Sequence, residues 1–435
     1  MTERIAVVGG GWAGMAAAVT LAAAGRSVCL FEAARVLGGR ARRVDLAERK
    51  VDNGQHILLG AYAQTLSLLR TVHGGRAQHE LFDRRRLHLE QPGVFRLKTA
   101  PLPAPWHLAT ALLTAHGLSR NERLSTVAFV RRLRRCGYRC AGQLTVSTLL
   151  ADQPDAAVTH LWEPLCIAAL NTPIEAASAQ IFLNVLRVAF AAHARDSDVL
   201  IPRIDLTALF PAPAAAYIAT RSGEVRLGEA VSGLTALADG VRLETQAREE
   251  HFAAALIAVG PHQLADLFAA HSSHATSVVL ARVAAFAYEP IRTIYLQYPC
   301  ALRLPVPIPM LKLNGDPGQW LFDRGQLGGA PGLAAVVIST DVAAGRVEHG
   351  VLASAIDTQL RKLMADLPPP VWEQTIVERR ATYACTAGLA RPAPGALQPR
   401  LYLAGDYTDA DFPATLEAAT RSGVAAARQI LAAHV

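Results

Sequence analysis

The chain has 435 residues, too many for one ordinary hydrophobic core and enough for two domains or for one elaborated α/β domain with an inserted partner. Hydrophobic residues make up 51% of the chain, and the formal net charge of +7 favours anionic partners. No nucleic-acid recognition motif accompanies this charge, and the six scattered cysteines form no C-x-x-C or zinc pattern, so the sequence argues against nucleic-acid binding and against a metal site.

The first predicted elements lie in Ile5 to Glu32: a strand, a glycine-rich turn, a helix and a second strand that ends in an acid. Gly9, Gly11 and Gly14 occupy the G-x-G-x-x-G positions of a dinucleotide-binding turn. We expect Gly9 to allow the tight turn, Gly11 to admit a pyrophosphate, and Gly14 to let helix and strand pack closely. Glu32 can accept ribose hydroxyls, which argues against a 2′-phosphate at that place.

Two polar segments follow this unit. In residues 35–42 the paired glycines Gly38 and Gly39 permit a ligand to approach the backbone, and arginines such as Arg40 can contact phosphate oxygens. Residues 51–62, VDNGQHILLGAY, place a cluster of polar side chains before an apolar continuation. This pattern predicts a site loop that contains Asp52, Asn53, Gln55 and His56.

A charge-free segment runs from Thr99 to Ser119, but prolines interrupt its first part, so only Trp106 to Leu118 could form a helix. Such a helix is too short to span a bilayer, which needs about 20 apolar residues. It is either a buried helix or an interfacial helix that dips into lipid. Arginine clusters at 84–86 and 131–135 are either solvated helix faces or contacts with an anionic membrane surface.

The remaining pattern is helical to about Leu206, and strands then return, ending in a C-terminal strand, LYLAGD, and an Ala-rich helix from about Leu416. This order predicts an α/β fold whose Rossmann-like domain is discontinuous. We expect that domain to comprise residues 1–75, 205–275 and 385–435. An α+β substrate domain would comprise residues 76–204 and 276–384, with residues 99–204 mostly helical.

The separated blocks resemble the flavin-dependent amine oxidase and phytoene desaturase superfamily over most of the chain. The glycine fingerprint with Glu32, the G-G-R at 38–40, the strand near Val231 and the C-terminal LAGDYTDADFPATLEAATRSG occur in that family's order. Within it, DNGQHILLGAY and LWEPLCIAALNTPIEAASAQIFLNVLR look like the squalene-associated FAD-dependent desaturases, also called hydroxysqualene dehydroxylases. The resemblance implies a GR2-type FAD-binding domain, and FAD is expected to be non-covalent because no suitable cysteine or histidine lies in the C-terminal block.

The resemblance also implies a role for particular residues. Glu32 would hold the adenosine ribose, the backbone of Val231 the adenine, and Asp406 the ribityl or pyrophosphate region. Leu416 to Ala418 would bring a helix N-terminus to the flavin ring, and such an end stabilises a nearby anion by roughly 0.3 to 1 kcal/mol at exposed sites. The complete set of expected cofactor contacts is Gly9, Gly11, Trp12, Ala13, Gly14, Glu32, Ala33, Gly39, Arg40, Val231, Gly405, Asp406, Leu416, Glu417 and Ala418.

The implied reaction belongs to squalene and hopanoid biosynthesis: hydroxysqualene, a long-chain isoprenoid, loses its hydroxyl and gains a hydride. Loss of an allylic hydroxyl leaves a delocalised cation, so we expect an apolar tunnel with one proton donor. His56 is the first candidate, since histidine titrates near neutral pH and lies in the loop with Asp52; a structural hydrogen bond is the alternative. Asp409 and Asp411 are the next candidates. The expected channel residues, for which plain core is the alternative, are Trp162, Leu165, Leu170, Asn171 and Phe182.

Two other functions stay open. One is an oxidase or desaturase of the same fold that acts on a carotenoid-like chain or an amine, although an amine oxidase would need an aromatic cage and aromatic residues are only 6% here. The other is a non-enzymatic lipid-binding protein that retains FAD. Because the first strand follows MTER directly, we expect a cytoplasmic protein without a signal peptide or transmembrane helix. We also expect contact with the inner face of the cell membrane and with other squalene-pathway enzymes.

Overall fold

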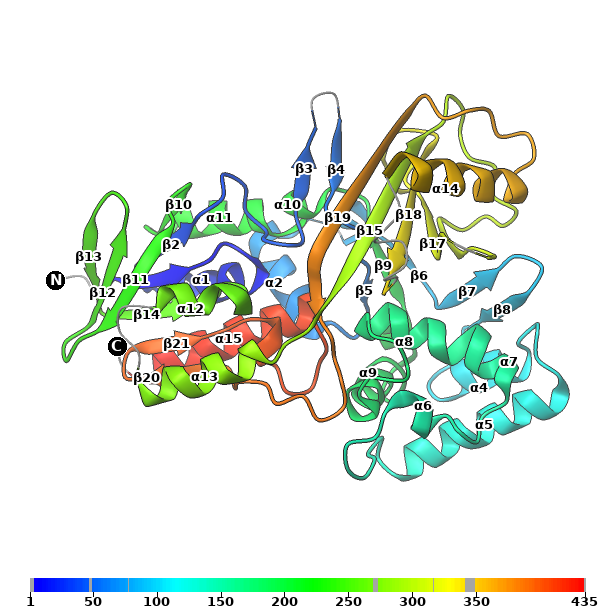
Figure 1. Ribbon diagram of the computed structural model, residues 1–435, viewed down its shortest axis with the longest axis horizontal. Coiled ribbons are helices and arrows are strands. Elements are labelled where there is room, and N and C mark those ends of the chain that lie inside the picture. The colour runs from blue at the N-terminus through cyan, green and yellow to red at the C-terminus, as the bar shows by residue number, and fades with distance from the viewer. Residues whose placement is uncertain are drawn as a thin grey trace.

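The computed structural model describes residues 4–46, 49–76, 78–268, 273–315, 317–340 and 349–433. Figure 1 shows an α/β lobe on the left, an antiparallel sheet at the upper right and a helical lobe at the lower right. Two long strands, β15 (Tyr288–Gln297) and β19 (Trp372–Tyr383), run between the α/β lobe and the upper sheet. Among the described residues, no helix has the length and apolar character needed to cross a bilayer.

The α/β lobe is built on a six-stranded sheet with the order β10-β2-β1-β14-β21-β20. All neighbouring pairs are parallel except β20 with β21. The strands are β1 (Ile5–Val8), β2 (Val28–Glu32), β10 (Glu224–Leu227), β14 (Ala254–Ile257), β20 (Gly395–Gln398) and β21 (Leu401–Leu403). Segments from both ends and the middle of the chain therefore share one sheet, as the predicted discontinuous α/β fold requires.

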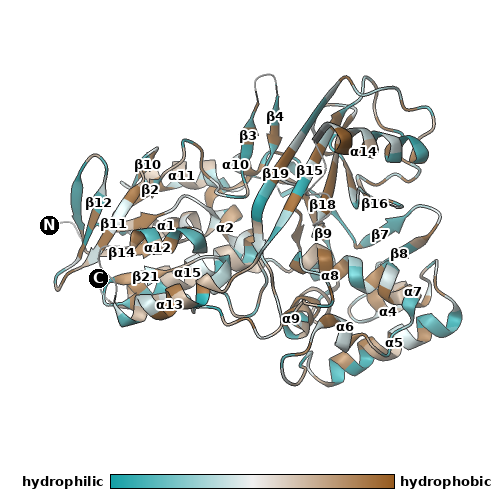
Figure 2. Ribbon diagram, in the orientation of Figure 1, coloured by the Kyte–Doolittle hydropathy of each residue, from teal (hydrophilic) through white to brown (hydrophobic). Residues whose placement is uncertain are grey.

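Both faces of this sheet are covered, which explains why its strands read as continuous apolar runs. Ile5 and Val7 face one side, where helices close the core: α1 (Trp12–Ala23), α2 (Ala63–His73), α11 (Pro211–Ala219) and α15 (Leu416–Ala432). Ala6 and Val8 face the other side, which is covered by the meander β11 (Val231–Ala236), β12 (Val241–Thr245) and β13 (Glu249–Phe252) and by α12 (Leu264–Leu267) and α13 (His274–Ala284). Figure 2 shows the polar character of the meander at the edge of this lobe.

Two glycines set the close packing at the centre of the α/β lobe. A Cβ added at Gly14 would lie 1.9 Å from the carbonyl oxygen of Gly9, so the helix and the turn before it can touch only because that position has no side chain. A Cβ at Gly423 would lie 2.1 Å from the carbonyl oxygen of Ala13, so α15 packs directly against the backbone of α1.

The upper sheet is antiparallel, with the order β16-β17-β18-β15-β19. Its other strands are β16 (Met310–Lys312), β17 (Trp320–Asp323) and β18 (Leu333–Ser339). Alternation along β15 sends Ile294 and Leu296 into the core under α14 (His349–Leu363), while Tyr295 belongs to the core on the opposite face. One face of this sheet therefore packs against α14, and the other face packs against the rest of the molecule.

The helical lobe contains α4 (Trp106–Leu113), α5 (Arg120–Arg135), α6 (Val146–Leu149), α7 (Asp155–Ala157), α8 (Glu163–Leu170) and α9 (Ala179–Phe190), with a π-helical turn at Val158–Trp162 before α8. The helix expected from Trp106 to Leu118 is shorter, because α4 ends at Leu113. Beyond it, His116 pairs with Arg96 of β8 (Phe95–Lys98), and Gly117 takes a φ of +89° against the Val94 carbonyl. Pairing with a strand thus ends the helix early.

Short strands connect the lobes. β3 (Arg43–Asp45) and β4 (Lys50–Asp52) form a hairpin that delivers the chain to the polar loop at 52–56. The sheet β5-β9-β6 joins Leu58–Leu59, Val199–Pro202 and Phe82–Arg85, while β7 (His88–Gln91) pairs with β8. The remaining short helices are α3 (Gln78–Leu81) and α10 (Leu206–Leu209).

Candidate cofactor and active site

The start of α1 is open to an anion. Gly11 is the N-cap, no side chain caps the helix, and no acidic residue lies in its first turn. A Cβ added at Gly11 would meet only the Gly39 Cα at 4.0 Å, so the backbone is accessible at this point. Free amides at a helix N-terminus and an unobstructed glycine suit the pyrophosphate of a dinucleotide.

Glu32 ends β2 beside this turn. Its carboxylate accepts hydrogen bonds from the backbone amides of Gly10, at 2.6 Å, and Ala34, at 2.8 Å. The Glu32 carbonyl accepts from Glu229, two residues before Val231, which opens β11. The expected ribose and adenine contacts, Glu32 and Val231, therefore lie on neighbouring segments, with Ala33 exposed next to them.

Trp12 links the glycine-containing segment at residues 35–42 to α1. Its indole N–H donates to the carbonyl of Ala41 at 3.0 Å, and its ring packs on Phe210 with centroids 4.9 Å apart. Gly11 forms an isolated parallel bridge with Gly38. Trp12 and Ala13 are both buried, so what they can offer a cofactor at this place is their backbone.

Arg40 joins three distant segments. Its guanidinium donates to the Asp406 carboxylate at 2.7 Å and to the Ala381 carbonyl, at the end of β19, at 2.8 Å. The attraction of Asp406 raises the pKa of Arg40 against the opposing effect of burial. Gly405, before Asp406, lies against the Tyr407 ring, where an added Cβ would come within 2.3 Å.

The first turn of α15 has a side-chain cap, whereas the first turn of α1 has none. The Thr415 hydroxyl accepts from the Ala418 amide at 3.1 Å. The buried Glu417 carboxylate accepts from the Gln64 and Thr65 amides and from the Thr65 hydroxyl, so it holds the start of α2, and burial raises its pKa. Leu416 is half-buried beside them.

The polar loop at 52–56 contacts both lobes. Asn53 donates to the Arg40 carbonyl at 2.8 Å and to the Glu378 carboxylate at 3.0 Å. Tyr295 of β15 donates to the Asp52 carbonyl at 2.8 Å and accepts from Gln55 at 2.7 Å. The loop is thereby fixed between the Arg40–Asp406 pair and the face of the upper sheet.

His56 is neutral at physiological pH in this setting. Burial and the charge of Arg40 lower its pKa to about 4, although a hydrogen bond to the Asn53 carbonyl opposes the shift. The expectation that His56 titrates near neutral pH is therefore wrong for the folded protein. A Cβ added at Gly54 would lie 3.6 Å from His56 Nε2 and 4.0 Å from the Thr293 hydroxyl, so both polar atoms lie next to Gly54. Among the described residues the buried Thr293 hydroxyl has no hydrogen-bond partner.

The acidic candidates have structural contacts. The Asp52 carboxylate accepts from the Leu206 amide at 2.9 Å, at the start of α10, and burial raises its pKa to about 6. Asp409 accepts from the Asp411 and Phe412 amides and pairs with Arg421 at 2.8 Å. Asp411 is exposed. Within the described part of the chain, no hydrogen bond joins the Asp52 carboxylate to His56.

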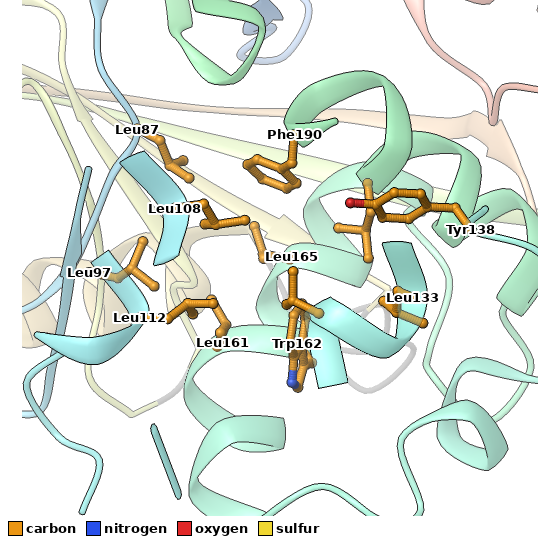
Figure 3. Close-up of a pocket in the computed structure, with 12 residues that line it drawn as sticks. Leu87, Leu97, Leu108, Leu112, Leu133, Tyr138, Leu161, Trp162, Leu165 and Phe190 are labelled. Carbon is orange, nitrogen blue, oxygen red and sulfur yellow. The ribbon is translucent and has the colours of Figure 1, made fainter. Parts of the chain in front are cut away.

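A small apolar cavity, about 20 Å³ in volume, lies among the side chains inside the helical lobe. Figure 3 shows leucines from several elements converging on it, with the Tyr138 hydroxyl directed inward and the Trp162 indole nitrogen directed away. Its lining residues are Leu87, Leu97, Leu108, Leu112, Val130, Leu133, Tyr138, Leu161, Trp162, Leu165, Leu186 and Phe190.

Two of the five expected channel residues, Trp162 and Leu165, line this pocket. Leu170 and Phe182 are buried core residues outside its lining. Asn171 ends α8 with φ +45° and donates to Thr382 at 2.9 Å, so it lies near the end of β19 rather than at the pocket. Its side-chain oxygen is buried without a hydrogen-bond partner among the described residues.

Sequence reasoning missed residues that tertiary contacts bring to the loop: Thr293, Tyr295 and Glu378. Nothing in the local pattern of β15 or β19 distinguishes them from ordinary strand residues. The pocket leucines of α4 and α5 were also missed, although the spacing of Leu108 and Leu112 places them on one helix face.

The fold and site together define a flavoprotein: a parallel sheet assembled from distant segments with an open helix N-terminus, joined through Arg40 to β19 of the antiparallel sheet. The chain belongs to the family of flavin containing amine oxidoreductases, whose family model matches residues 12–431. It is an FAD-dependent oxidoreductase. The open α1 terminus and the Glu32 carboxylate fit FAD.

Known proteins agree with this assignment. The hydroxysqualene dehydroxylase of Rhodopseudomonas palustris is 30% identical, with 100% of this chain and 99% of the relative covered. The hydroxysqualene dehydroxylase of Sinorhizobium fredii is 25% identical, with 98% of each covered. A putative protoporphyrinogen oxidase structure from Exiguobacterium sp. has a TM-score of 0.69 at 16% identity, covering 99% of each chain. Putrescine oxidase bound to putrescine has a TM-score of 0.70 at 14% identity, again covering 99% of each. The structural likenesses establish the fold alone, and the predicted fold class and family are confirmed.

Proposed function

We propose that this protein reductively dehydroxylates hydroxysqualene to squalene in squalene and hopanoid biosynthesis. The full-length similarity to hydroxysqualene dehydroxylases carries the proposal, because it extends over both lobes rather than over the cofactor domain alone. The lining of the small cavity in the helical lobe is compatible with it, since all twelve side chains are aliphatic or aromatic and none carries a charge.

The proposed reaction breaks one carbon–oxygen bond and forms one carbon–hydrogen bond. The hydroxyl takes a proton and leaves as water, and the allylic carbon receives two electrons as a hydride. Reduced FAD, when bound, supplies that hydride. The task of the chain is to hold the cofactor non-covalently, orient the alcohol, deliver the proton and keep bulk water out.

The cofactor roles within this proposal are those that the family resemblance implies, and the geometry of these residues is compatible with them. Glu32 holds the adenosine ribose, Val231 the adenine, and the α1 terminus the pyrophosphate, while Arg40 fixes Asp406 next to the ribityl region. His56 is proposed as the proton donor, with Asp52 keeping its loop attached to α10. A histidine pKa of about 4 makes the imidazolium scarce at neutral pH but strongly acidic when it forms.

A desaturase acting on a polyene is the second candidate. A zeta-carotene desaturase from Synechocystis sp. is 31% identical, but the similarity covers only 28% of this chain.

An amine oxidase has less support. Tyr383 and Tyr407 are fully buried, with hydroxyls directed at the Phe412 and Val259 carbonyls, and neither lines the apolar pocket.

Product analysis tests the assignment. In deuterium oxide without oxygen and under single-turnover conditions, photoreduced protein is incubated with hydroxysqualene, and oxidised protein is incubated with a carotenoid-like polyene. We expect squalene with one deuterium at the former carbinol carbon and oxidation of one flavin per squalene. Oxidised protein that is reduced by the polyene, with no squalene from the first incubation, would show the desaturase instead. Unreactive flavin with both lipids would indicate a non-enzymatic protein.

We further propose that the protein works at a membrane surface, near other enzymes of the squalene pathway. The isoprenoid substrate supports this location, because a chain of this length is stored in lipid rather than in water. Formation of a complex with those enzymes is tested by co-purification of the intact protein from membranes at low salt.

A further inference from the structure

Helix α4 is apolar on both faces. Leu108 and Leu112 point into the pocket of the helical lobe (Figure 3). On the opposite face Trp106 is 63% exposed and Leu113 is 43% exposed. Seven residues span nearly two helical turns, so these two side chains form one outward ridge. One helix thickness therefore separates the pocket from an exposed apolar surface, and Leu102, 39% exposed, extends that surface before the helix.

Helix α5 lies against α4 and also has one face toward the pocket and one toward solvent. Its solvent-exposed face carries positive charge. Val130 and Leu133 line the pocket, while the arginines at 131, 132, 134 and 135 are exposed. Among the described residues, only Arg132 of these four pairs with a carboxylate, that of Asp152 at 3.4 Å. The first part of α5 adds Leu124, which is 59% exposed. The helix thus offers unpaired positive charge next to exposed apolar side chains.

We infer that the outer ridge of α4 and the arginine end of α5 dock on an anionic lipid bilayer, and that the isoprenoid chain passes between bilayer and pocket at the seam of these two helices. The lipid assignment follows from charge complementarity, because exposed arginines are attracted to a negatively charged bilayer and tryptophan favours the interfacial region. The identity of the passing chain rests on the proposed function.

The seam explains why α4 carries apolar residues where a surface helix ordinarily carries polar ones. Moving an isoprenoid through water is unfavourable in proportion to the apolar surface that it exposes. Because Leu108 and Leu112 of the docked helix line the pocket, passage along this helix would keep the chain against apolar side chains.

Flotation of the full-length, FAD-loaded protein tests the docking surface. Vesicles of phosphatidylcholine, with or without phosphatidylglycerol, are compared for wild type, the double variant W106E/L113E and the control Val371→Glu. Val371 is 65% exposed and precedes β19 in the upper sheet, so it matches Trp106 in exposure but not in place. We expect recovery of wild type and control with anionic vesicles at low salt, and at least about a tenfold loss for the double variant.

A second variant, R131E/R135E, changes charge and leaves the ridge intact. We expect it to lose the preference for phosphatidylglycerol that wild type shows, and we expect wild-type binding to fall as salt screens the arginines. Double-variant recovery equal to that of wild type, with wild-type FAD content, would overturn the inference. Wild-type binding that ignores both salt and phosphatidylglycerol would also overturn it.

Turnover measurements distinguish the passage of substrate between α4 and α5 from the chemical step. With substrate dispersed in detergent, W106E/L113E should match wild type; with substrate embedded in anionic vesicles, it should be at least about tenfold slower. Equal rates in vesicles would overturn the passage through the seam. If wild type makes no squalene in either form but still floats, the proposed reaction fails and the docking surface stands.

Discussion

The Arg40 guanidinium lies 2.7 Å from the Asp406 carboxylate, across 366 residues of sequence. Arg40 follows the second strand of the cofactor domain, Asp406 follows the last, and the same guanidinium reaches Ala381 of β19. One side chain thereby fixes both cofactor segments and the strand that enters the upper sheet. The geometry of the site depends on this contact as much as on the glycine turn.

Replacing Arg40 by Met should destabilise the protein by about 1 to 3 kcal/mol, because the buried Asp406 carboxylate and the Ala381 carbonyl lose their donor. FAD affinity should fall as well. The measurement is urea unfolding together with fluorescence titration of FAD. Arg76→Met is the control, since Arg76 forms an exposed pair with Glu80 at 2.9 Å, and its loss should cost less than about 1 kcal/mol. Equal effects of the two substitutions would contradict the assigned role of Arg40.

Replacing Glu32 by Gln should weaken FAD binding by roughly 1.5 to 3 kcal/mol, if the charged carboxylate accepts the ribose hydroxyls. The carboxylate already accepts from Gly10 and Ala34, and an amide offers only one accepting oxygen in its place. Isothermal titration with FAD measures the change. Glu249→Gln, at a side chain 60% exposed, should bind FAD as wild type does. An unchanged dissociation constant for the Glu32 variant would show that the Glu32 carboxylate does not bind the ribose hydroxyls.

Gly423→Ala should destabilise the protein by about 1 to 3 kcal/mol, since the new methyl group must push α15 away from the Ala13 backbone. Gly350→Ala is the matched control in α14, where an added Cβ meets nothing within 4 Å. That change should alter stability by less than about 1 kcal/mol, in the stabilising direction expected of Ala in a helix. Thermal unfolding of both variants measures these changes in stability. A Gly423→Ala variant as stable as wild type would show that α15 can move away from α1 without loss of stability.

Asp52 and His56 should affect the pH dependence of stability with opposite signs. Burial raises the Asp52 pKa to about 6, so the folded state binds its proton more tightly and wild type gains stability over Asp52→Asn as pH falls from 7 to 5, by about 1 kcal/mol. His56, whose pKa is about 4, resists protonation, so wild type loses stability relative to His56→Gln over the same range. Urea unfolding at both pH values measures each difference. Parallel curves for wild type and either variant would contradict the burial of that group.

His56 should also control the rate of the proposed reaction. If its imidazolium donates the proton, the wild-type single-turnover rate should rise as pH falls from 8 to 5, toward tenfold per unit, because the donor form is scarce above its pKa. His56→Gln should be slower by roughly 10²- to 10⁴-fold without this rise, and should retain FAD. A wild-type rate independent of pH over this interval would assign proton delivery to another group.

The cofactor half of the site could be read from the sequence because its residues are local. Strand, glycine turn, helix and terminal acid follow one another within residues 5–32, and the contact of Gly14 with the Gly9 carbonyl is itself short-range. The apolar runs of β1 and β14 likewise indicated strands, and in the structure neighbouring residues such as Ala6 and Val7 are both buried because the sheet is covered on both faces. Local pattern was sufficient wherever the chemistry lies within one supersecondary unit.

The substrate half was decided by tertiary structure. Thr293 and Tyr295 reach the loop at 52–56 only because β15 crosses from one lobe to the other, and a strand pattern does not specify which face meets a distant loop. The pKa of His56 fell well below neutrality because burial and Arg40 act through space. The sequence by itself determined the family, the cofactor and the glycine turn. Contacts across hundreds of residues determined where Asp52, His56 and the apolar pocket lie, since long-range packing alone sets their surroundings.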